Sequence, residues 1–360
     1  LLGLRKPDPT DNVNVTTDIS DNMELIDDYF AGRFAVTPGR NAIRNGDMGV
    51  AQRGDGAYTG NQYGVDGWRY LANGGAPVAT RVAAGIGAGF GVDGARYALQ
   101  AAISGQAAAG DLVDFAQAIE DVRTLAGKQV TLSFSALATA GTPKIGIEIE
   151  QNFGTGGAPS ATVLTAIQAV TISTVATRYS VTFTVPNING KTLGTGGNDF
   201  LAVHLWLSAG STNAARASNI GIQNSTFQIT DVQLEVGSVA TAFERLPQQV
   251  QLAWCQRYFE RINLNGQDDM FAAGLVFNTT AAIGFLKWTQ TMRAAPSVTF
   301  TGGFEVVGST IITASGVGAS NVTVHGAQLD MTITGGTAGQ GAVFRSSTSG
   351  TNNISISAEL

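Results

Sequence analysis

The stretch ITDVQLEVGSVATAFERLPQQVQLAWCQRYFERI, residues 229–262, changes its pattern halfway and so decides how the chain is organised. Its first eight residues place β-branched and other apolar side chains among polar ones, as strands do. Gly237 breaks that pattern, and Pro247 is favoured in the first turn of a helix because its missing N–H has no partner there. From residue 248 to residue 262 apolar side chains recur every four positions, which predicts a helix with a broad apolar face. The stripe consists of Val250, Trp254, Tyr258 and Ile262, widened by Leu252, Cys255 and Phe259.

The predicted linking helix, 248–262, separates two β-rich parts of the chain. Short apolar runs joined by Gly-rich turns predict a mainly β domain over 39–247, an antiparallel sandwich of jelly-roll type. Apolar residues on one face of Gly110–Thr124 also predict a helical insert there. The strands expected in this domain are Gln129–Leu137, Lys144–Gln151, Ala166–Val175, Thr177–Val185, Phe200–Ser208 and Phe227–Val236.

The part from 263 to 360 is expected to form a smaller C-terminal β-sandwich. Its apolar runs are again short and separated by Gly, Ser and Thr, which is typical of strands and turns. The strands expected here are Phe271–Phe277, Ala281–Leu286, Ser297–Thr301, Phe304–Ala314, Asn321–Val324, Gln328–Thr334 and Ile354–Leu360.

Residues 1–38 form a separate N-terminal segment with one short predicted helix. Apolar residues follow one another there at spacings of four, three and four, as in the seam of a coiled coil. A helix of about three turns is marginal in water by itself, so other residues must cover this seam. It either packs on its own domain or forms a short parallel bundle with copies from other chains. The seam residues are Ile19, Met23, Ile26 and Phe30.

The composition excludes several classes of partner. Charged residues make up 13% of the chain, about half of the ~25% usual in soluble domains, and Gly contributes 46 residues. The net charge is −6 with no cluster of Lys or Arg, so we expect no nucleic-acid partner. The single cysteine, Cys255, excludes an intrachain disulfide, and no run of ~18 apolar residues predicts membrane insertion.

Few residues suggest catalysis. His204 and His325 lie in different predicted domains, and neither has neighbours typical of a Ser-His-Asp system, so each is expected in a core or at a sheet edge. Glu148 and Glu150 share one face of a predicted strand, and two carboxylates are enough for glycoside hydrolysis. Polar residues that alternate along the outer face of a strand are the ordinary explanation, so we predict no enzyme.

Two separate runs carry a resemblance to one protein family. The run DVQLEVGSVATAFERLP, followed by CQRYFERI, resembles the end of the carbohydrate-binding-module-like β-sandwich found in tail-fibre and head-fibre virion structural proteins of tailed bacteriophages. The opening of that domain is matched in order by Asn41–Met48, Gln52–Gly54, Tyr63 and Asp66–Trp68. The resemblance covers about residues 41–262 and implies a galactose-binding-like jelly roll, with Trp68 in its core. The run GLRKPDPTDNVNVTTDISDNMELIDD is similar to the leader with which phage fibres attach to the particle.

The resemblance implies a fibre or spike on the exterior of a virion. It would bind host-surface polysaccharide, contact other virion proteins through residues 1–38, and form a homotrimer. The trimer interface would use the seam of the first helix together with Val250, Trp254 and Tyr258. Sugar C–H faces pack on aromatic rings, so Tyr58, Tyr63 and Trp206 are the candidate glycan-binding residues. Three alternatives remain: a head fibre on the capsid, a capsule depolymerase, and a secreted bacterial carbohydrate-binding module.

A structural calcium ion is the remaining hypothesis from the sequence. The candidate carboxylates are Asp47, Asp231 and Glu235. In glycan-binding sandwiches the first and last strands lie together, often beside a bound Ca²⁺, and the segments around Asp47 and Asp231 resemble those two places. Calcium needs six to eight oxygen ligands, so these side chains alone do not make a site. The alternative is that the aspartates cap turns and accept hydrogen bonds from backbone amides.

Overall fold

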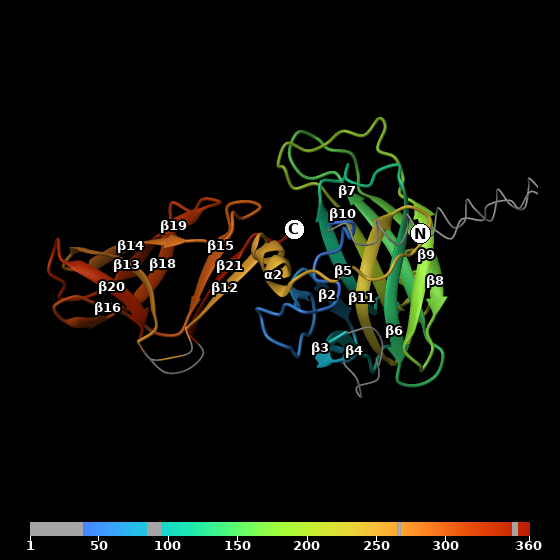
Figure 1. Ribbon diagram of the computed structural model, residues 1–360, viewed down its shortest axis with the longest axis horizontal. Helices are drawn as coiled ribbons and strands as arrows, with labels where there is room; N and C mark the ends of the chain where they lie inside the picture. The colour runs from blue at the N-terminus through green and yellow to red at the C-terminus, as the bar shows by residue number, and fades with distance from the viewer. Residues whose placement is uncertain (1–38, 85–94, 265, 267, 348–351) are drawn as a thin grey trace, which may run out of the picture.

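The structure is a computed structural model that describes residues 39–84, 95–264, 266, 268–347 and 352–360. Two β-rich bodies lie side by side with the helix α2 between them (Figure 1). The predicted attachment segment 1–38, with Ile19, Met23, Ile26 and Phe30, lies outside the described residues.

The first body is a sandwich of two antiparallel sheets. The chain passes repeatedly from one sheet to the other, so the mainly β fold with a jelly-roll sandwich is confirmed. The six-stranded sheet has the order β1 (Gln62–Tyr63), β2 (Arg69–Asn73), β5 (Leu112–Glu120), β10 (Phe200–Ala209), β7 (Lys144–Asn152), β8 (Val163–Thr171). The five-stranded sheet has the order β3 (Val78–Ala83), β4 (Tyr97–Ala102), β11 (Thr226–Val236), β6 (Gln129–Ala138), β9 (Thr177–Thr184).

Alternating apolar residues build the core between these two sheets. Leu132 and Phe134 of β6 point inward and are fully buried, as are Ile147 and Ile149 of β7. Trp68 is also buried in this core, as the resemblance implies, and its indole N–H donates to the carbonyl of Asn45 at 3.2 Å. Burying each of these large side chains stabilises the fold by roughly 1.5–3 kcal/mol.

The opening motif closes the sandwich by lying along β11. Ala42 N–H donates to the Leu234 carbonyl, and Val232 N–H donates to the carbonyl of Gly46. A Cβ on Gly46 would stand 2.0 Å from the Val232 carbonyl oxygen, so only glycine permits this approach. The first and last parts of the sandwich therefore lie together.

The predicted helix at Gly110–Thr124 is wrong, because β5 occupies this segment. β5 is a central strand between β2 and β10, and its residues 113 to 117 are buried in succession. The strand buries the polar residues Asp114 and Gln117 among apolar ones, so its apolar residues fall at three- and four-residue spacings that match a helix by chance.

The predicted linking helix is right only in its first half. α2 covers Gln248–Gln256, and the chain then enters the strand β12 (Phe259–Leu264), which pairs with β21 (Asn352–Ser357). Partners almost a hundred residues further along the chain therefore determine the structure at 259–262, so the local periodicity failed to predict it.

The second body has a three-stranded and a seven-stranded sheet around a core of its own. The smaller sheet has the order β12, β21, β15 (Ser297–Thr301). The larger has the order β17 (Ile311–Thr313), β16 (Phe304–Val307), β20 (Gly341–Ser346), β13 (Met270–Asn278), β14 (Ala281–Lys287), β19 (Gly326–Thr332), β18 (Gly316–Ser320). The expected single strand at Phe304–Ala314 is the hairpin β16–β17, and the strand expected at Asn321–Val324 is instead β18, just before it.

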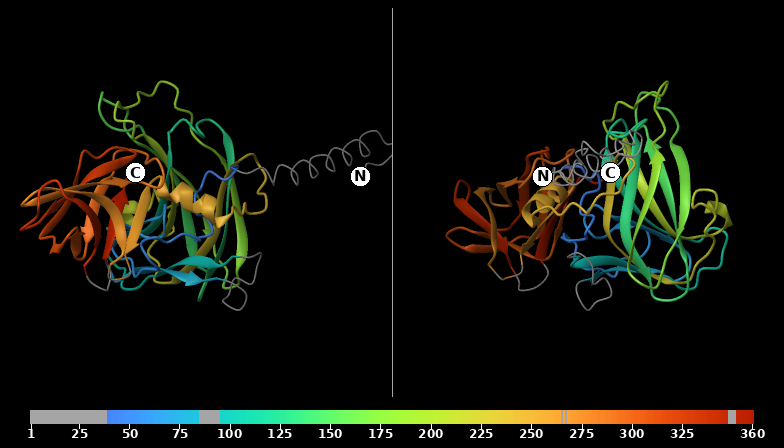
Figure 2. Two further views of the ribbon diagram at one scale, coloured as in Figure 1. Left: turned by 60° about the vertical axis from the view of Figure 1, so that its left-hand side comes forward. Right: turned by 45° about the vertical axis from the view of Figure 1, so that its right-hand side comes forward.

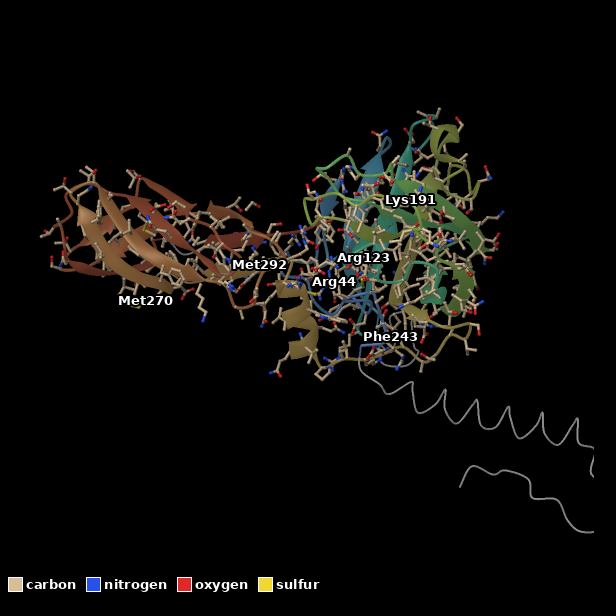
Figure 3. The ribbon with its side chains drawn as sticks, turned by 90° about the horizontal axis from the view of Figure 1, so that it is seen from above. Arg44, Arg123, Lys191, Phe243, Met270 and Met292 are labelled. Carbon is tan, nitrogen blue, oxygen red and sulfur yellow. The ribbon has the colours of Figure 1, made fainter. Side chains whose placement is uncertain are left out.

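A charged cluster joins the two bodies. The carboxylate of Glu359 lies between Arg44, at 3.7 Å, and Arg53, at 3.2 Å, and its side chain is only 6% exposed. Arg257 donates two hydrogen bonds, of 2.9 and 2.8 Å, to Glu120 of the sandwich. Figure 2 shows α2 lying against the sandwich at this junction, and Figure 3 labels Arg44 near it.

The apolar stripe of the linking helix divides into an exposed and a buried part. Val250 and Trp254 are 48% and 37% exposed, so both are accessible on α2. Tyr258 is buried, and the guanidinium of Arg44 stacks on its ring at 3.7 Å. The prediction that Tyr258 lies in a trimer interface is therefore wrong, since it packs between the two bodies of one chain.

None of the helices within the described ranges is long and apolar enough to cross a membrane.

Candidate functional site

A groove of about 650 Å³ lies between the two bodies, and we call it the interbody groove. The outer face of the sheet β12–β21–β15 forms one side, and the chain around residues 53–63 of the sandwich forms the other. Its main lining side chains are Arg53, Tyr58, Gln62, Tyr63, Phe259, Arg261, Ser297, Thr299, Thr301, Asn353, Ser355 and Ser357.

Strand register gives the groove a floor of regularly spaced hydroxyl groups. Thr299 of β15 stands opposite Ser355 of β21, which in turn stands opposite Arg261 of β12. The neighbouring rows are Ser297–Ser357–Phe259 and Thr301–Asn353–Asn263. Successive residues on one face of a strand are about 6.6 Å apart, so the floor presents polar groups at regular intervals.

The opposite wall combines aromatic rings with a guanidinium group. Arg53 stacks on the Phe259 ring at 3.3 Å and lies 5.6 Å from the ring centre of Tyr63. The Tyr63 hydroxyl donates to the carbonyl of Leu360. Burial, with the nearby Glu359 carboxylate, raises the pKa of Tyr63 to about 12, so it remains a neutral phenol. The wall therefore sets aromatic rings beside the guanidinium group of Arg53.

Two arginines of the groove have donors that the described residues do not satisfy. Arg53 Nη1 and Arg261 Nε are buried and have no hydrogen-bond partner among those residues. Sugar hydroxyls can accept from guanidinium groups and donate to serine, threonine and amide oxygens. The groove has the chemistry to bind a polyhydroxylated chain.

The three aromatic residues predicted to bind glycan lie in different surroundings. Tyr63 lines the groove, and its role in binding remains a prediction. Tyr58 also lines it but is only 6% exposed, with its hydroxyl donating to the Gly54 carbonyl, so it serves mainly as a core residue. Trp206 is only 2% exposed, and its indole N–H donates to Glu148 at 3.0 Å. The prediction of Trp206 as a sugar platform is wrong, because the segment around Ala217 covers it.

A buried charge network surrounds Trp206. His204 donates from Nδ1 to Asp114 at 2.6 Å and from Nε2 to Glu150 at 3.1 Å. Burial alone would lower the pKa of His204, but the charge and hydrogen bond of Asp114, the hydrogen bond of Glu150 and the charge of Glu148 raise it to about 10. His204 is therefore an imidazolium at neutral pH, and its hydrogen bond holds the pKa of Glu150 below its ordinary value although burial acts to raise it.

Glu148 and Glu150, considered above as a hydrolytic pair, are both held in ion pairs. Glu148 is fully buried and accepts two hydrogen bonds of 2.8 Å from Arg216. Glu150 is held by His204. A general acid and a nucleophile must both reach the glycosidic bond, and a fully buried Glu148 does not.

The three carboxylates of the calcium hypothesis do not form one site. Asp231 is paired with Arg245 at 2.7 Å, and burial raises its pKa although Arg245 opposes this. Glu235 instead accepts hydrogen bonds from the backbone and hydroxyl of Thr241. Asp47 accepts the N–H of Gly49, as in the turn-capping alternative. Within the described ranges no three His, Cys, Asp or Glu residues gather as metal ligands, and with Arg245 occupying Asp231 these residues do not fit Ca²⁺.

Sequence reasoning missed most of the groove. Its floor comes from β15 and β21, and β21 pairs with a strand that the periodicity assigned to a helix. The alternation of Ser297, Thr299 and Thr301 with apolar residues was the available signal, since a polar face recurs there with period two.

No protein-family model and no curated protein matches the chain. Among solved structures, the enzymatically active domain of tailspike protein 4 of bacteriophage CBA120 is 13% identical, with a TM-score of 0.33, over 56% of this chain and 22% of that one. The CBM22-2 xylan-binding domain of Paenibacillus barcinonensis Xyn10C is 15% identical, with a TM-score of 0.30, over 47% of this chain and 91% of that one. The N-terminal cellulose-binding domain of Cellulomonas fimi β-1,4-glucanase C is 18% identical, with a TM-score of 0.29, over 48% and 91%.

The neighbours are thus carbohydrate-binding modules and a phage tailspike domain, of which the chain spans about a fifth.

Proposed function

We propose that the chain is a structural protein of a tailed-phage or phage-like particle, a trimeric fibre or spike that binds host-surface glycans in the interbody groove. The observation that carries the binding proposal is the pairing of a hydroxyl-rich sheet face with the Arg53, Tyr63 and Phe259 wall. Hydroxyl, amide and guanidinium groups match the donors and acceptors of a sugar chain, and ring edges match its C–H faces.

Attachment to the particle is proposed from the sequence. The leader in residues 1–38 is similar to that of phage fibres, which supports a position on the virion exterior with contacts to other virion proteins through this segment. A head fibre on the capsid would use the same segment, so the two positions differ only in the protein it contacts.

Exposed apolar residues support assembly into a trimer. Val250 and Trp254 lie one turn apart on α2 and remain accessible, although side chains of this kind are usually covered. Three copies would place three grooves on one spike, so weak individual binding becomes strong through effective concentration.

We expect Trp254→Glu to convert the trimer to a monomer while both β-bodies stay folded. A carboxylate at the centre of an apolar contact must be desolvated without a partner, which costs several kcal/mol. Light scattering gives the mass directly, with a wild-type mass near three chains of 37.1 kDa. Gln249→Glu, at an exposed position off the stripe, is the matched control and should leave the trimer intact. A wild-type monomer would overturn the trimer proposal.

The experiment that tests the function is a glycan array that carries bacterial surface polysaccharides. We expect the purified chain to bind a subset of them without releasing reducing ends during long incubation. Absence of binding to every polysaccharide would contradict the proposed function, and release of oligosaccharides would favour a depolymerase.

A further inference from the structure

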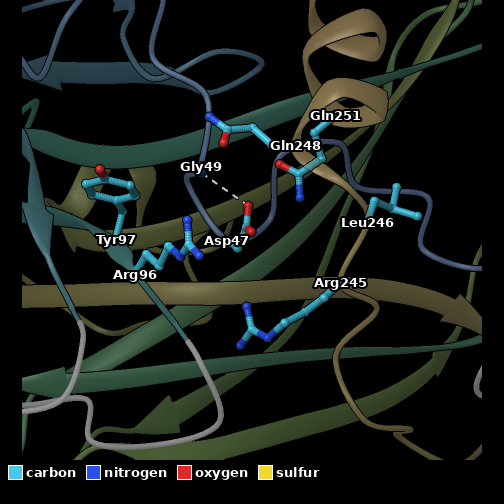
Figure 4. Close-up of a pocket in the computed structure, with 8 residues that line it drawn as sticks. All are labelled: Asp47, Gly49, Arg96, Tyr97, Arg245, Leu246, Gln248 and Gln251. Atoms are coloured by element: carbon cyan, nitrogen blue, oxygen red, sulfur yellow. Dashed lines mark hydrogen bonds between the residues drawn. The ribbon is translucent and has the colours of Figure 1, made fainter.

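A second cavity, which we call the α2 pocket, opens where α2 begins (Figure 4). It has a volume of about 450 Å³ and shares no lining residue with the interbody groove. The end of the opening motif, the start of β4, the residues just before α2 and the first turn of α2 contribute its walls. Its principal side chains are Asp47, Arg96, Tyr97, Arg245, Gln248 and Gln251.

The first turn of α2 leaves backbone donors at the pocket. Pro247 provides no side-chain cap, and the turn contains no acidic residue. Val250 and Gln251 donate their N–H groups to the Pro247 carbonyl, so the N–H groups of Gln248 and Gln249 remain without a partner among the described residues. Such donors, with the positive end of the helix dipole, favour an anionic group.

A buried amide provides an independent sign of a ligand. Gln251 is only 5% exposed, yet its side chain makes no hydrogen bond to any described residue. It lines the pocket, and Figure 4 shows its amide directed toward Asp47. The amide atoms are open to the space of the pocket, so they can form hydrogen bonds with a group that enters it.

The charges of the pocket select the kind of ligand. Arg96 is exposed and faces the pocket together with Arg245, which is also bonded to Asp231. Asp47 accepts one hydrogen bond, from Gly49, and leaves other lone pairs for the pocket. Two guanidinium groups and a helix start suit a carboxylate, but Asp47 would repel a simple anion. A ligand that fits both must carry a carboxylate and hydroxyl donors in one molecule.

We propose that the α2 pocket binds the carboxylate-bearing residue of an acidic glycan, such as a hexuronate. This inference rests on the proposed glycan-binding function and extends it to a second site with a defined ligand class. Arg96 and the start of α2 hold the sugar carboxylate, while Asp47 and Gln251 accept and donate hydrogen bonds to neighbouring hydroxyls.

The test compares two probes on the full chain by titration calorimetry: a glucuronate-terminated trisaccharide, and the same trisaccharide with its carboxyl reduced to an alcohol. We expect the wild type to bind the acidic probe at least tenfold more tightly, with a preference that weakens in high salt. Arg96→Gln should reduce the preference to under twofold, and Gln251→Leu should weaken binding of both probes at least fivefold. Gln249→Leu, on the same helix but outside the pocket, is the matched control and should change neither.

The groove-filling variant Thr299→Trp separates this inference from the proposed function. Pocket binding should survive in Thr299→Trp, since the two sites share no residue. If Thr299→Trp abolishes binding of the acidic probe, the sugar binds in the groove and the inference about the pocket is wrong. If polysaccharides bind on the array but the wild type shows no preference for the acidic probe, the inference fails while the proposed function stands. Should Gln251→Leu lower the melting temperature, Arg96→Gln, at an exposed position, still decides the result.

Discussion

Replacing His204 with leucine should lower the free energy of unfolding by about 3–5 kcal/mol at neutral pH, because it leaves buried carboxylates without their counter-charge. Asp114 and Glu150 both bond to the imidazolium, and Asp114 Oδ1 already has no partner within the described ranges. Urea denaturation measures the change. His325→Leu is the matched control, because His325 is exposed and should contribute under about 0.5 kcal/mol.

The same imidazolium makes the stability depend on alkaline pH. The folded pKa of His204, about 10, lies above its ordinary value of 6.5. A group whose pKa rises on folding stabilises fully below the unfolded pKa, and this stabilisation is lost as pH rises through the folded pKa. Wild-type stability should therefore fall between about pH 6.5 and pH 10, and His204→Leu should flatten that fall. Equal slopes in the two proteins would contradict the assignment of the charge.

Replacing Glu359 with glutamine should lower the free energy that holds the two bodies together by a similar amount, about 3–5 kcal/mol. Its carboxylate is the shared partner of Arg44 and Arg53, whose side chains are only 7% and 17% exposed. Two buried guanidinium groups would then face each other without an anion. Because Arg53 also forms the groove wall, glycan binding should weaken together with the junction.

Hydrogen exchange provides the measurement for Glu359→Gln. Amides of β12 and β21 should exchange faster in the variant, since β12 begins at the junction and β21 ends there. Asp268→Asn is the matched control: Asp268 is 51% exposed, and its partner Arg345 keeps a second carboxylate, Glu305. Unchanged protection in Glu359→Gln would show that the charged cluster does not hold the bodies together.

The sequence was most informative where apolar and polar residues alternate along a strand. β6, β7 and β15 were predicted within a residue or so, because this alternation is a direct signal, and it persists in β6 and β7 although the fold also covers their polar faces. β5 failed because Gln117 interrupts the alternation and its apolar residues fall at helical spacings. β12 failed because a partner far along the chain outweighs local helical periodicity.

The prediction of site residues was limited because the sequence does not show which side chains the fold covers. Tyr63 was predicted and lines the groove, but Trp206 was chosen for its aromatic ring alone and is covered by the segment around Ala217. The His204 network could not be predicted, because its aspartate, Asp114, lies on the strand that was assigned to a helix. Whether an aromatic or titratable residue is accessible depends on neighbours that only the fold provides.

Titration of one array-selected neutral oligosaccharide into the wild type and Thr299→Trp tests whether the interbody groove binds glycan. Thr299 is exposed on the edge strand β15, so an indole there fills the groove without disturbing the core. We predict at least a tenfold weaker dissociation constant for Thr299→Trp and an unchanged one for Thr184→Trp, an exposed threonine on the edge strand β9. Equal affinity in all three proteins would show that glycan does not bind in the interbody groove.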